Sequence, residues 1–218
     1  MSKEYRNPKF KWNANEKLIV FIKAPRPGTV KTRLARTIGA ESACAAYRRI
    51  VATLLARLHS LGAVELCFHP DDALAEVQPW LRPGWTAAPQ GGGDLGQRLQ
   101  LAFQRAVAAG SRRVLVIGSD CPAVTLADLR EAWDSLRARD VALGRASDGG
   151  YWLIGLREVQ PDLFRDIPWS TENVFAETAQ RIRRGGLTLH LLRELSDVDT
   201  EADWRSFLAT QNRNAMTP

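Results

Sequence analysis

Residues 23–33 read "KAPRPGTVKTR" and combine four cations with two prolines and a glycine in eleven positions. The cations are Lys23, Arg26, Lys31 and Arg33. Proline restricts φ, so a loop that contains it loses less entropy when it is ordered, and Gly28 permits a turn. The segment therefore predicts a binding site for a di- or triphosphate. The alternative is a solvated turn with scattered cations.

This loop does not have the P-loop pattern. G-x-x-x-x-G-K-[ST], aligned on Lys31, requires glycine at positions 25 and 30, where the chain has Pro25 and Val30. The chain also shows no G-x-S-x-G, no H-E-x-x-H and no G-x-G-x-x-G after a predicted strand. These absences count against hydrolase-elbow, zincin and dinucleotide-binding sites.

Four carboxylates stand in polar clusters that follow aliphatic runs. They are Asp120 in "GSDCP", Asp148 in "SDGG", and Asp197 and Asp199 in "SDVDT". Carboxylate oxygens suit a hard divalent cation that is shared with phosphate oxygens. Mg²⁺ usually takes only one or two carboxylates, so not all four are expected to be ligands. An aspartate near the start of a helix can instead be a cap.

A glycine-rich segment at residues 90–98 reads "QGGGDLGQR". Consecutive glycines let the backbone approach a flat ring or a ribose closely. Asp94 or Arg98 could then form a hydrogen bond to the edge of that ring. A flexible loop without a ligand could have the same composition.

The segment "DIPWST" at residues 166–171 places Trp169 beside two hydroxyl groups. Ser170 or Thr171 is expected to cap the helix that follows. Trp169 could in addition line a pocket for an acceptor molecule.

The regular elements between these clusters must position them. Strands are expected at residues 18–22, 63–68, 113–117, 141–145, 151–156 and 187–192, and helices at 40–60, 95–109, 126–138 and 172–184. Thr125 can cap the third helix, and Gly185 with Gly186 can end the fourth. This alternation predicts an α/β fold with a mainly parallel sheet and helices on both faces.

Ligands bind such sheets at the carboxyl ends of the strands. The polar and charged clusters follow predicted strands, and they lie at residues 23–33, 118–122, 147–150 and 196–200. Because all four clusters follow predicted strands, we expect them to form one common site and not four independent surface loops.

Length and composition indicate one globular domain. The chain has 218 residues, 45% of them hydrophobic and 25% charged, and we expect a domain at residues 18–210 with tails at 1–17 and 211–218. No apolar run approaches 18 residues, the first residues show no export signal, and the three cysteines form no C-x-x-C. A cytoplasmic protein without membrane insertion is therefore expected.

The net charge of +6 could suggest a nucleic-acid partner, but its distribution argues against one. Residues 1–17 hold five cations and two acids, which is +3 of the total. Elsewhere the arginines are mixed with acids, and no basic stripe is interleaved with aromatic residues. The expected partners are small molecules.

Five segments together resemble a bacterial family of small GT-A-type transferases, often described as glycosyltransferases, over residues 18 to about 208. They are "LIVFIKAPRPGTVKTRLA", "GGGDLGQRL", "VIGSDCPAVTLADL", "DGGYWLIGL" and "DIPWSTENVF", in this order. The resemblance implies membership of the nucleotide-diphospho-sugar transferase superfamily and a Rossmann-like GT-A fold. The wider relatives of that family include molybdenum-cofactor and phospholactate nucleotidyltransferases.

The resemblance also implies a role for each segment. The nucleotide-binding residues would be Lys23, Ala24, Pro25, Gly28, Lys31, Arg33, Gly93, Asp94 and Arg98. Asp120 would bind a metal after the central strand, and Asp199 would complete that site. Asp148 would face the transferred group. The residues on the acceptor side would be Gly149, Tyr151, Trp169 and Ser170.

Three positions depart from the patterns of these relatives. The opening loop contains proline where nucleotidyltransferases have a glycine-rich, arginine-containing loop. Ser119-Asp120-Cys121 stands where glycosyltransferases of this fold usually show D-x-D. Ser147 precedes "DGG", where the family commonly has an acidic residue.

The expected function is a transferase that depends on Mg²⁺ or Mn²⁺ and uses a nucleotide-diphospho-sugar donor and a small-molecule acceptor. Lys31 and Arg33 would neutralise charge on the leaving nucleoside diphosphate, and Asp148 would orient an acceptor hydroxyl or act as its base. One alternative is a nucleotidyltransferase that releases pyrophosphate from a nucleoside triphosphate. A second alternative is a nucleotide-binding protein without catalysis.

Overall fold

The structure, a computed structural model, describes residue 13 and residues 15–216. Its strands are β1 (Glu16–Lys23), β2 (Val64–His69), β3 (Thr86–Pro89), β4 (Arg113–Gly118), β5 (Val141–Ala146), β6 (Tyr151–Leu156) and β7 (Leu189–Leu195). Its helices are α1 (Thr32–Ile38), α2 (Ala40–Arg57), α3 (Leu74–Val77), α4 (Leu95–Ala108), α5 (Leu126–Ser135), α6 (Val174–Arg184) and α7 (Glu201–Met216), with short 3-10 turns η1 (Gln78–Trp80) and η2 (Pro161–Leu163).

The seven strands form one mixed sheet in the order β3-β2-β1-β4-β6-β5-β7. Strand β6 runs antiparallel to its neighbours β4 and β5, and the other paired strands are parallel. The predicted α/β class with a mainly parallel sheet is therefore confirmed.

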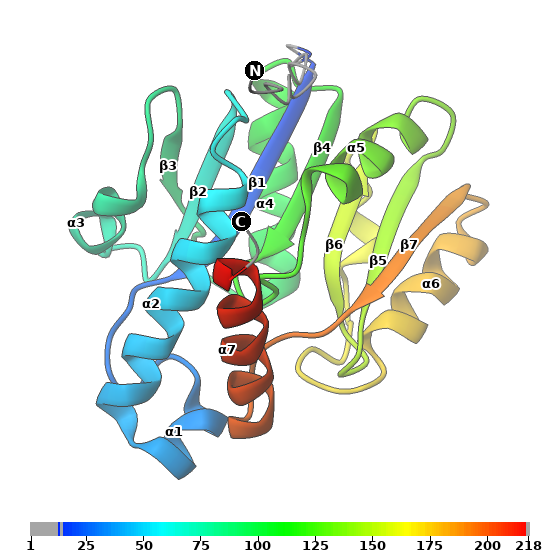
Figure 1. Cartoon of the computed structure of the whole chain (residues 1–218). Coiled ribbons are helices and arrows are strands. Elements are labelled where there is room, and N and C mark those ends of the chain that lie inside the picture. Colours follow the sequence, from blue (N-terminus) through cyan, green and yellow to red (C-terminus); the bar gives the residue numbers. More distant parts are fainter. Residues whose placement is uncertain (1–12, 14, 217–218) are drawn as a thin grey trace, which may run out of the picture.

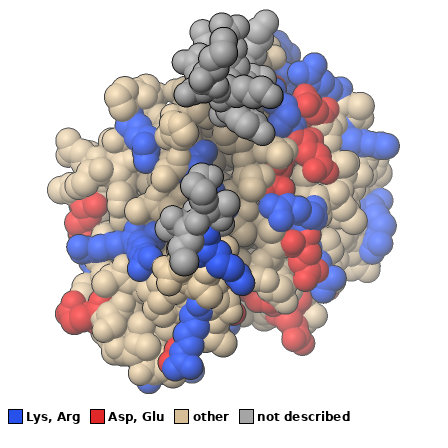
Figure 2. Space-filling model, viewed as in Figure 1, with Lys and Arg blue, Asp and Glu red and all other residues tan. Residues whose placement is uncertain are grey.

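Helices cover both faces of the sheet because each strand buries side chains alternately on either side. In β1, Leu18 and Val20 pack with α2 and α5, whereas Ile19 packs with α4. Helix α7 lies beside α2 on the near face in Figure 1, and α4 lies behind the sheet. Figure 2 shows that Lys and Arg side chains are interspersed with Asp and Glu side chains on this near face. No helix in the described part of the chain is both long and apolar enough to cross a membrane.

Both predicted domain ends need correction. Strand β1 begins at Glu16, inside the predicted 1–17 tail, because Glu16 is buried and accepts a hydrogen bond from Arg113 at 3.2 Å. Residues 1–12 and 14 of that tail lie outside the described residues. At the other end, α7 continues through the first residues of the predicted 211–218 tail, and Phe207 packs with Ile50 and Val198.

Among the elements that were not predicted, β3 and α7 have weak sequence signals. Strand β3 reads "TAAP", and it exists because it pairs with β2 at the sheet edge. Helix α7 is mostly polar, and its buried contacts come from few side chains. The predicted ends of the fourth helix are confirmed, since Gly185 is its C-cap residue and Gly186 follows with φ of 66°.

The predicted cap of α5 is also confirmed. The Thr125 hydroxyl accepts a hydrogen bond from the Asp128 backbone N–H, and Asp128 in return accepts from the Thr125 backbone N–H at 2.8 Å. Arg193 of β7 donates from Nε to the Asp128 carboxylate at 2.5 Å and from Nη2 at 2.8 Å. Asp128 thus joins the start of α5 to the edge strand of the sheet.

Replacing Arg193 with glutamine should lower the free energy of unfolding at pH 7 by about 1–2 kcal/mol, because buried Asp128 then keeps its charge without a cation. Burial alone would raise the pKa of Asp128, but hydrogen bonds from Arg193 and Thr125 outweigh burial and lower it below 3.8. A carboxyl with a lowered pKa stabilises the fold above its ordinary pKa, and that stabilisation is lost as the pH falls through the folded-state value.

Urea unfolding at pH 7 and pH 3 checks this expectation. The difference between wild type and Arg193→Gln should shrink at pH 3. Arg112→Gln, at an exposed position outside this pair, is the control. An equal difference at both pH values would contradict the proposed contribution of the Arg193–Asp128 pair.

Candidate functional site

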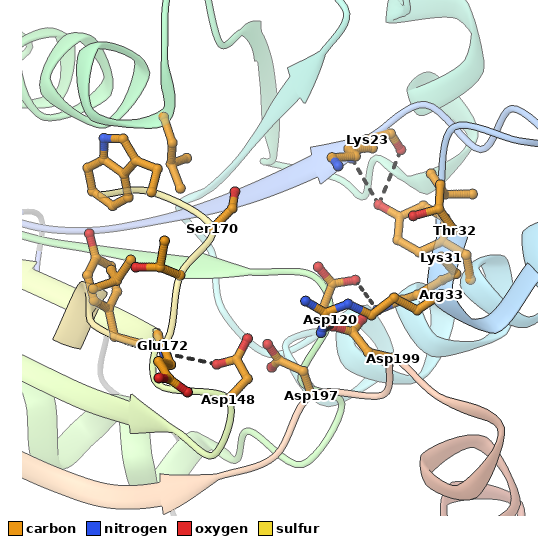
Figure 3. A pocket seen from close by; sticks show the side chains of 18 of the residues that line it. Lys23, Lys31, Thr32, Arg33, Asp120, Asp148, Ser170, Glu172, Asp197 and Asp199 are labelled. Atoms are coloured by element: carbon orange, nitrogen blue, oxygen red, sulfur yellow. Dashed lines mark hydrogen bonds and ion pairs between the residues drawn. The ribbon is translucent and has the colours of Figure 1, made fainter. Parts of the chain in front are cut away.

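One pocket of about 900 Å³ opens at the carboxyl ends of β1, β4, β5 and β7. Its wall contains nine of the site residues predicted from the sequence, and Figure 3 shows how several of them converge. These residues are Lys23, Lys31, Arg33, Asp120, Asp148, Tyr151, Trp169, Ser170 and Asp199. Clusters that are far apart in the chain therefore do share one site.

Lys31 lies at the centre of the charged contacts. Its Nζ is 2.5 Å from Asp120 Oδ1 and 2.9 Å from Asp199 Oδ1, and its side chain is 2% exposed. Burial alone would lower the pKa of Lys31, but the charges of Asp120 and Asp199 outweigh burial and raise it. The lysine is therefore a buried ammonium that two carboxylates hold in place.

The backbone and a neighbouring cation complete this arrangement. Lys31 has φ of 49°, in the left-handed region, directly before α1. Arg33 Nη1 lies 3.7 Å from Asp199 Oδ2 and is mostly exposed. The loop thus presents one buried and one exposed cation to the pocket.

Asp197 also lines this pocket, although only Asp120 and Asp199 were expected to be metal ligands. Burial, together with the charge on Asp120, raises the pKa of Asp197 to about 7, although the charge on Lys31 acts to lower it. A proton can therefore reside on Asp197 near neutral pH, while Asp120 and Asp199 face Lys31.

Tyr47, on the buried face of α2, lines the pocket and was not among the predicted site residues. Its hydroxyl accepts a hydrogen bond from the Lys23 backbone N–H at 2.9 Å and lies 3.0 Å from Ser119 Oγ. Burial raises the pKa of Tyr47, so its hydroxyl stays protonated. This side chain joins the end of β1 to the end of β4, where Asp120 follows.

The wall opposite Lys31 is formed by Asp148, Gly150, Tyr151 and residues 169–174, here called the opposite wall. Tyr151 and Trp169 meet edge to face with ring centroids 6.4 Å apart. Gly149, with φ of 90°, lies behind this wall, and a Cβ there would be 2.2 Å from the Glu172 carbonyl oxygen. The Phe175 N–H also donates to the Gly149 carbonyl at 2.9 Å.

Gly149→Ala should therefore cost about 2–4 kcal/mol of unfolding free energy, because it combines backbone strain with a steric clash. Gly110→Ala is a matched control, because Gly110 has φ of 95° but nothing within 4 Å of its Cβ position. We expect about 1 kcal/mol for that change. Urea unfolding measures both, and equal losses would show that the contact with Glu172 is unimportant.

The expected N-cap at Ser170 or Thr171 is wrong. Helix α6 begins at Val174, and Asn173 at its N-cap position forms no side-chain cap. Ser170 has φ of 66°, and Thr171 Oγ1 donates to the Pro168 carbonyl at 2.7 Å. These residues form a turn that shapes the opposite wall before the helix starts.

Several predicted nucleotide-binding residues do not line the pocket. They are Ala24, Pro25, Gly28, Gly93, Asp94 and Arg98. Arg26 does not line the pocket either, because its side chain pairs with two acids: Nη2 lies 2.5 Å from Glu76 and 3.1 Å from Asp72. Only Lys23, Lys31 and Arg33 of the four loop cations therefore face the pocket.

The glycine-rich segment has structural contacts of its own. Asp94 caps α4 by accepting the Gln97 backbone N–H at 2.8 Å, and Arg98 Nε donates to the Gly93 carbonyl at 3.0 Å. A Cβ on Gly96 would lie 2.3 Å from the Phe164 carbonyl oxygen and 3.0 Å from the Trp169 ring. Contact of residues 93, 94 and 98 with a base or ribose stays a prediction.

Because β3 exists, residues 91–96 do form a G-x-G-x-x-G between a strand and a helix. The Asp94 carboxylate already accepts an N–H at the start of α4, where a pyrophosphate would need to bind. These glycines serve the turn and the packing against Trp169, so the match does not indicate a dinucleotide site.

In the described part of the chain, no three His, Cys, Asp or Glu side chains are arranged to hold a metal ion together. The predicted ligands Asp120 and Asp199 instead share the Lys31 ammonium. A site of two carboxylates would need further oxygens from a ligand such as a phosphate.

Known structures share this fold over most of the chain. A crystal structure from Desulfovibrio desulfuricans G20, described as a "putative nucleotide-diphospho-sugar transferase", is 36% identical with a TM-score of 0.85. The match covers 93% of this chain and 89% of that one. No curated protein matches the chain.

Two more distant structures show the fold alone. 4-Diphosphocytidyl-2C-methyl-D-erythritol synthase from Anaerococcus prevotii DSM 20548 has 10% identity and a TM-score of 0.59, over 91% of this chain and 99% of that one. Rv0371c from Mycobacterium tuberculosis H37Rv, solved as a complex with manganese, has 17% identity and a TM-score of 0.52, over 90% and 99%.

The Rossmann-like fold of nucleotide-diphospho-sugar transferases, which the sequence predicted, is thus confirmed. The family model "Uncharacterized protein conserved in bacteria (DUF2064)" matches residues 53–171, more than half of the chain. The protein therefore belongs to the DUF2064 family.

Proposed function

We propose that the protein transfers a sugar from a nucleotide-diphospho-sugar donor to a small-molecule acceptor, with a divalent metal ion as cofactor. The observation that carries this proposal is the buried Lys31 ammonium between Asp120 and Asp199, at the strand ends that face Asp148. The 36% identical structure described as a nucleotide-diphospho-sugar transferase supports it.

Lys31 and Arg33 would bind the diphosphate of the donor. When the bond between the anomeric carbon and the diphosphate oxygen breaks, negative charge grows on the leaving nucleoside diphosphate. Positioned cations stabilise that charge more in the transition state than in the ground state. Lys31 suits this role because its position is fixed before the substrate binds.

The carboxylates of Asp120 and Asp199 fit a hard divalent cation such as Mg²⁺ or Mn²⁺. Their side chains are 45% and 32% exposed, so their oxygens can reach a ligand in the pocket. When bound, the cation would supply Lewis-acid stabilisation to the diphosphate. Two protein carboxylates with phosphate oxygens are the usual ligands of Mg²⁺ in such sites.

Asp148 would act on the acceptor. Its Oδ1 accepts the Gly150 N–H at 2.9 Å, which fixes the carboxylate at the pocket wall. The acceptor hydroxyl would give its proton to Asp148 as its oxygen bonds to the anomeric carbon. Asp148 is on the side of the pocket away from Lys31, so donor and acceptor groups would meet between them (Figure 3).

A nucleotidyl transfer is the second candidate, and structures described as a cytidylyltransferase and as an inositol-1-phosphate CTP transferase share the fold. The two reactions release different products. The protein should be incubated with Mn²⁺ or Mg²⁺ and separate panels of nucleotide sugars and nucleoside triphosphates, with assays for nucleoside diphosphate and pyrophosphate. We expect nucleoside diphosphate from a nucleotide sugar. Release of pyrophosphate alone would refute the proposed sugar transfer.

A further inference from the structure

The cations among the described residues that line the pocket lie on one side of it, beside Asp120 and Asp199. These cations, Lys23, Lys31 and Arg33, all come from one loop and its preceding strand. The opposite wall carries the carboxylates of Asp148 and Glu172 and no cation among the described lining residues. Figure 3 shows Asp148 and Glu172 on the side away from Lys31 and Arg33.

Two arginines from elements near this wall are engaged elsewhere. Arg145 of β5 has its Nε 3.5 Å from Glu194 and stacks on Phe175 at 5.6 Å. Arg181 of α6 donates to the carbonyl oxygens of Asp162 and Asp166 at 3.1 Å. Neither of them lines the pocket, so an anion at the opposite wall would find no cationic partner there.

The two carboxylates of this wall are held in fixed relation to each other. The backbone of Gly149 packs closely against the backbone of Glu172, so a Cβ on Gly149 would lie 2.5 Å from Glu172 Cα. The Phe175 N–H bonds to the Gly149 carbonyl at 2.9 Å. An anionic ligand therefore could not separate the Asp148 turn from the Glu172 loop without breaking this contact.

The polar atoms of the two aromatic side chains in this wall are buried. Tyr151 Oη and Trp169 Nε1 are buried and have no hydrogen-bond partner within the described residues, and both side chains line the pocket. Burial raises the pKa of Tyr151, so the hydroxyl keeps its proton. Trp169 Nε1 lies against α4, since a Cβ on Gly96 would be 3.0 Å from it, so neither donor is presented to a ligand. The carboxylates of Asp148 and Glu172 can instead accept hydrogen bonds from the hydroxyl or ammonium groups of a ligand.

We infer that the opposite wall takes an uncharged or cationic acceptor, a polyol or amino-polyol, and discriminates against acceptors that carry a phosphate. A phosphate there would face two carboxylates without a cation, which is a repulsive arrangement. An amino group would instead gain two carboxylate partners. This inference rests on the proposed sugar transfer and adds the substrate class of its acceptor.

Paired compounds that differ by a phosphate test this inference. The affinities of glucosamine and glycerol should be compared with those of glucosamine 6-phosphate and glycerol 3-phosphate, by calorimetry on the full chain with Mn²⁺ and UDP present. Each unphosphorylated compound should bind at least about tenfold more tightly than its partner. Equal or tighter binding of the phosphorylated members, or no binding of the unphosphorylated ones, would overturn the inference.

A charge reversal gives the internal control. Glu172→Lys should raise the affinity for glucosamine 6-phosphate about tenfold, whereas Glu158→Lys, the same change at an exposed position outside the pocket, should not. An unchanged affinity in Glu172→Lys would also overturn the inference. Absence of nucleoside diphosphate release from every nucleotide sugar would refute the sugar transfer, whereas faster release with phosphorylated acceptors would refute only their exclusion.

Discussion

Replacing Asp120 with asparagine should lower kcat for sugar transfer by about 1000-fold and leave the chain folded. Asp120 follows the central strand β4 and is 2.5 Å from the Lys31 ammonium. Stabilising charge on a leaving diphosphate through a metal contributes several kcal/mol, and about 4 kcal/mol corresponds to 1000-fold in rate. Asparagine keeps the shape of the side chain but removes the charge that holds the cation.

Turnover of the best nucleotide sugar, followed as nucleoside diphosphate release, measures this effect. Asp134→Asn is the matched control, because Asp134 is an exposed aspartate of α5 that pairs with the nearby Arg137 and does not line the pocket. That variant should keep its activity. A loss below tenfold in Asp120→Asn, with normal unfolding by urea, would remove Asp120 from the proposed mechanism.

Replacing Lys31 with methionine should have two effects of opposite sign. Without the ammonium, Asp120 and Asp199 become free to bind a divalent cation, so the affinity for Mn²⁺ alone should rise about tenfold. The affinity for a nucleoside diphosphate with Mn²⁺ present should fall, and turnover should fall about 100-fold, because the phosphate loses its buried cation.

Electron paramagnetic resonance of Mn²⁺ measures the first effect, and calorimetry with nucleoside diphosphates measures the second. Arg36→Met removes an exposed cation of α1 that does not line the pocket, and it should change both quantities by less than threefold. If Lys31→Met lowered both affinities, the lysine would support the carboxylates and would not compete with the cation for them.

Much of the fold could be predicted because its signals are local. The aliphatic run "RVLVI" predicts a buried strand, and the spacing of apolar residues in α2 predicts a helix with one buried face. The alternation of such strands and helices along the chain predicts the α/β class. Strand β3 could not be predicted in this way, because "TAAP" becomes a strand only through pairing with β2. Helix α7 depends in the same manner on where Phe207 packs.

The site was predictable in part for a related reason. Lys31, Asp120 and Asp199 were found because charged residues at strand ends meet at one edge of a parallel sheet. Their ion pairs could not be predicted, because Lys31 and Asp199 lie 168 positions apart. Arg26 carries the same charge as Lys31 in the same loop, but it pairs with Glu76 and Asp72.

Glu172 and Tyr47 were absent from the predicted site for different reasons. Glu172 is the residue after "DIPWST", and it lines the pocket where its backbone packs closely against Gly149, a contact between segments that are distant in the sequence. Tyr47 has the spacing of a core residue, which it is, and its hydroxyl reaches Lys23 and Ser119 at the end of the sheet. Sequence periodicity indicates burial but does not show what a buried polar tip contacts.

The central claim is that a metal-dependent diphosphate site lies between Lys31 and the carboxylates of Asp120 and Asp199. Titration calorimetry of nucleoside diphosphates with and without Mn²⁺ tests this claim most directly. The wild-type chain should bind at least one of UDP, GDP, ADP and CDP at least about tenfold more tightly with Mn²⁺, and Asp120→Ala should abolish that gain. Binding that is equal with and without metal, and unchanged in Asp120→Ala, would contradict the claim and favour a nucleotide-binding protein without a metal site.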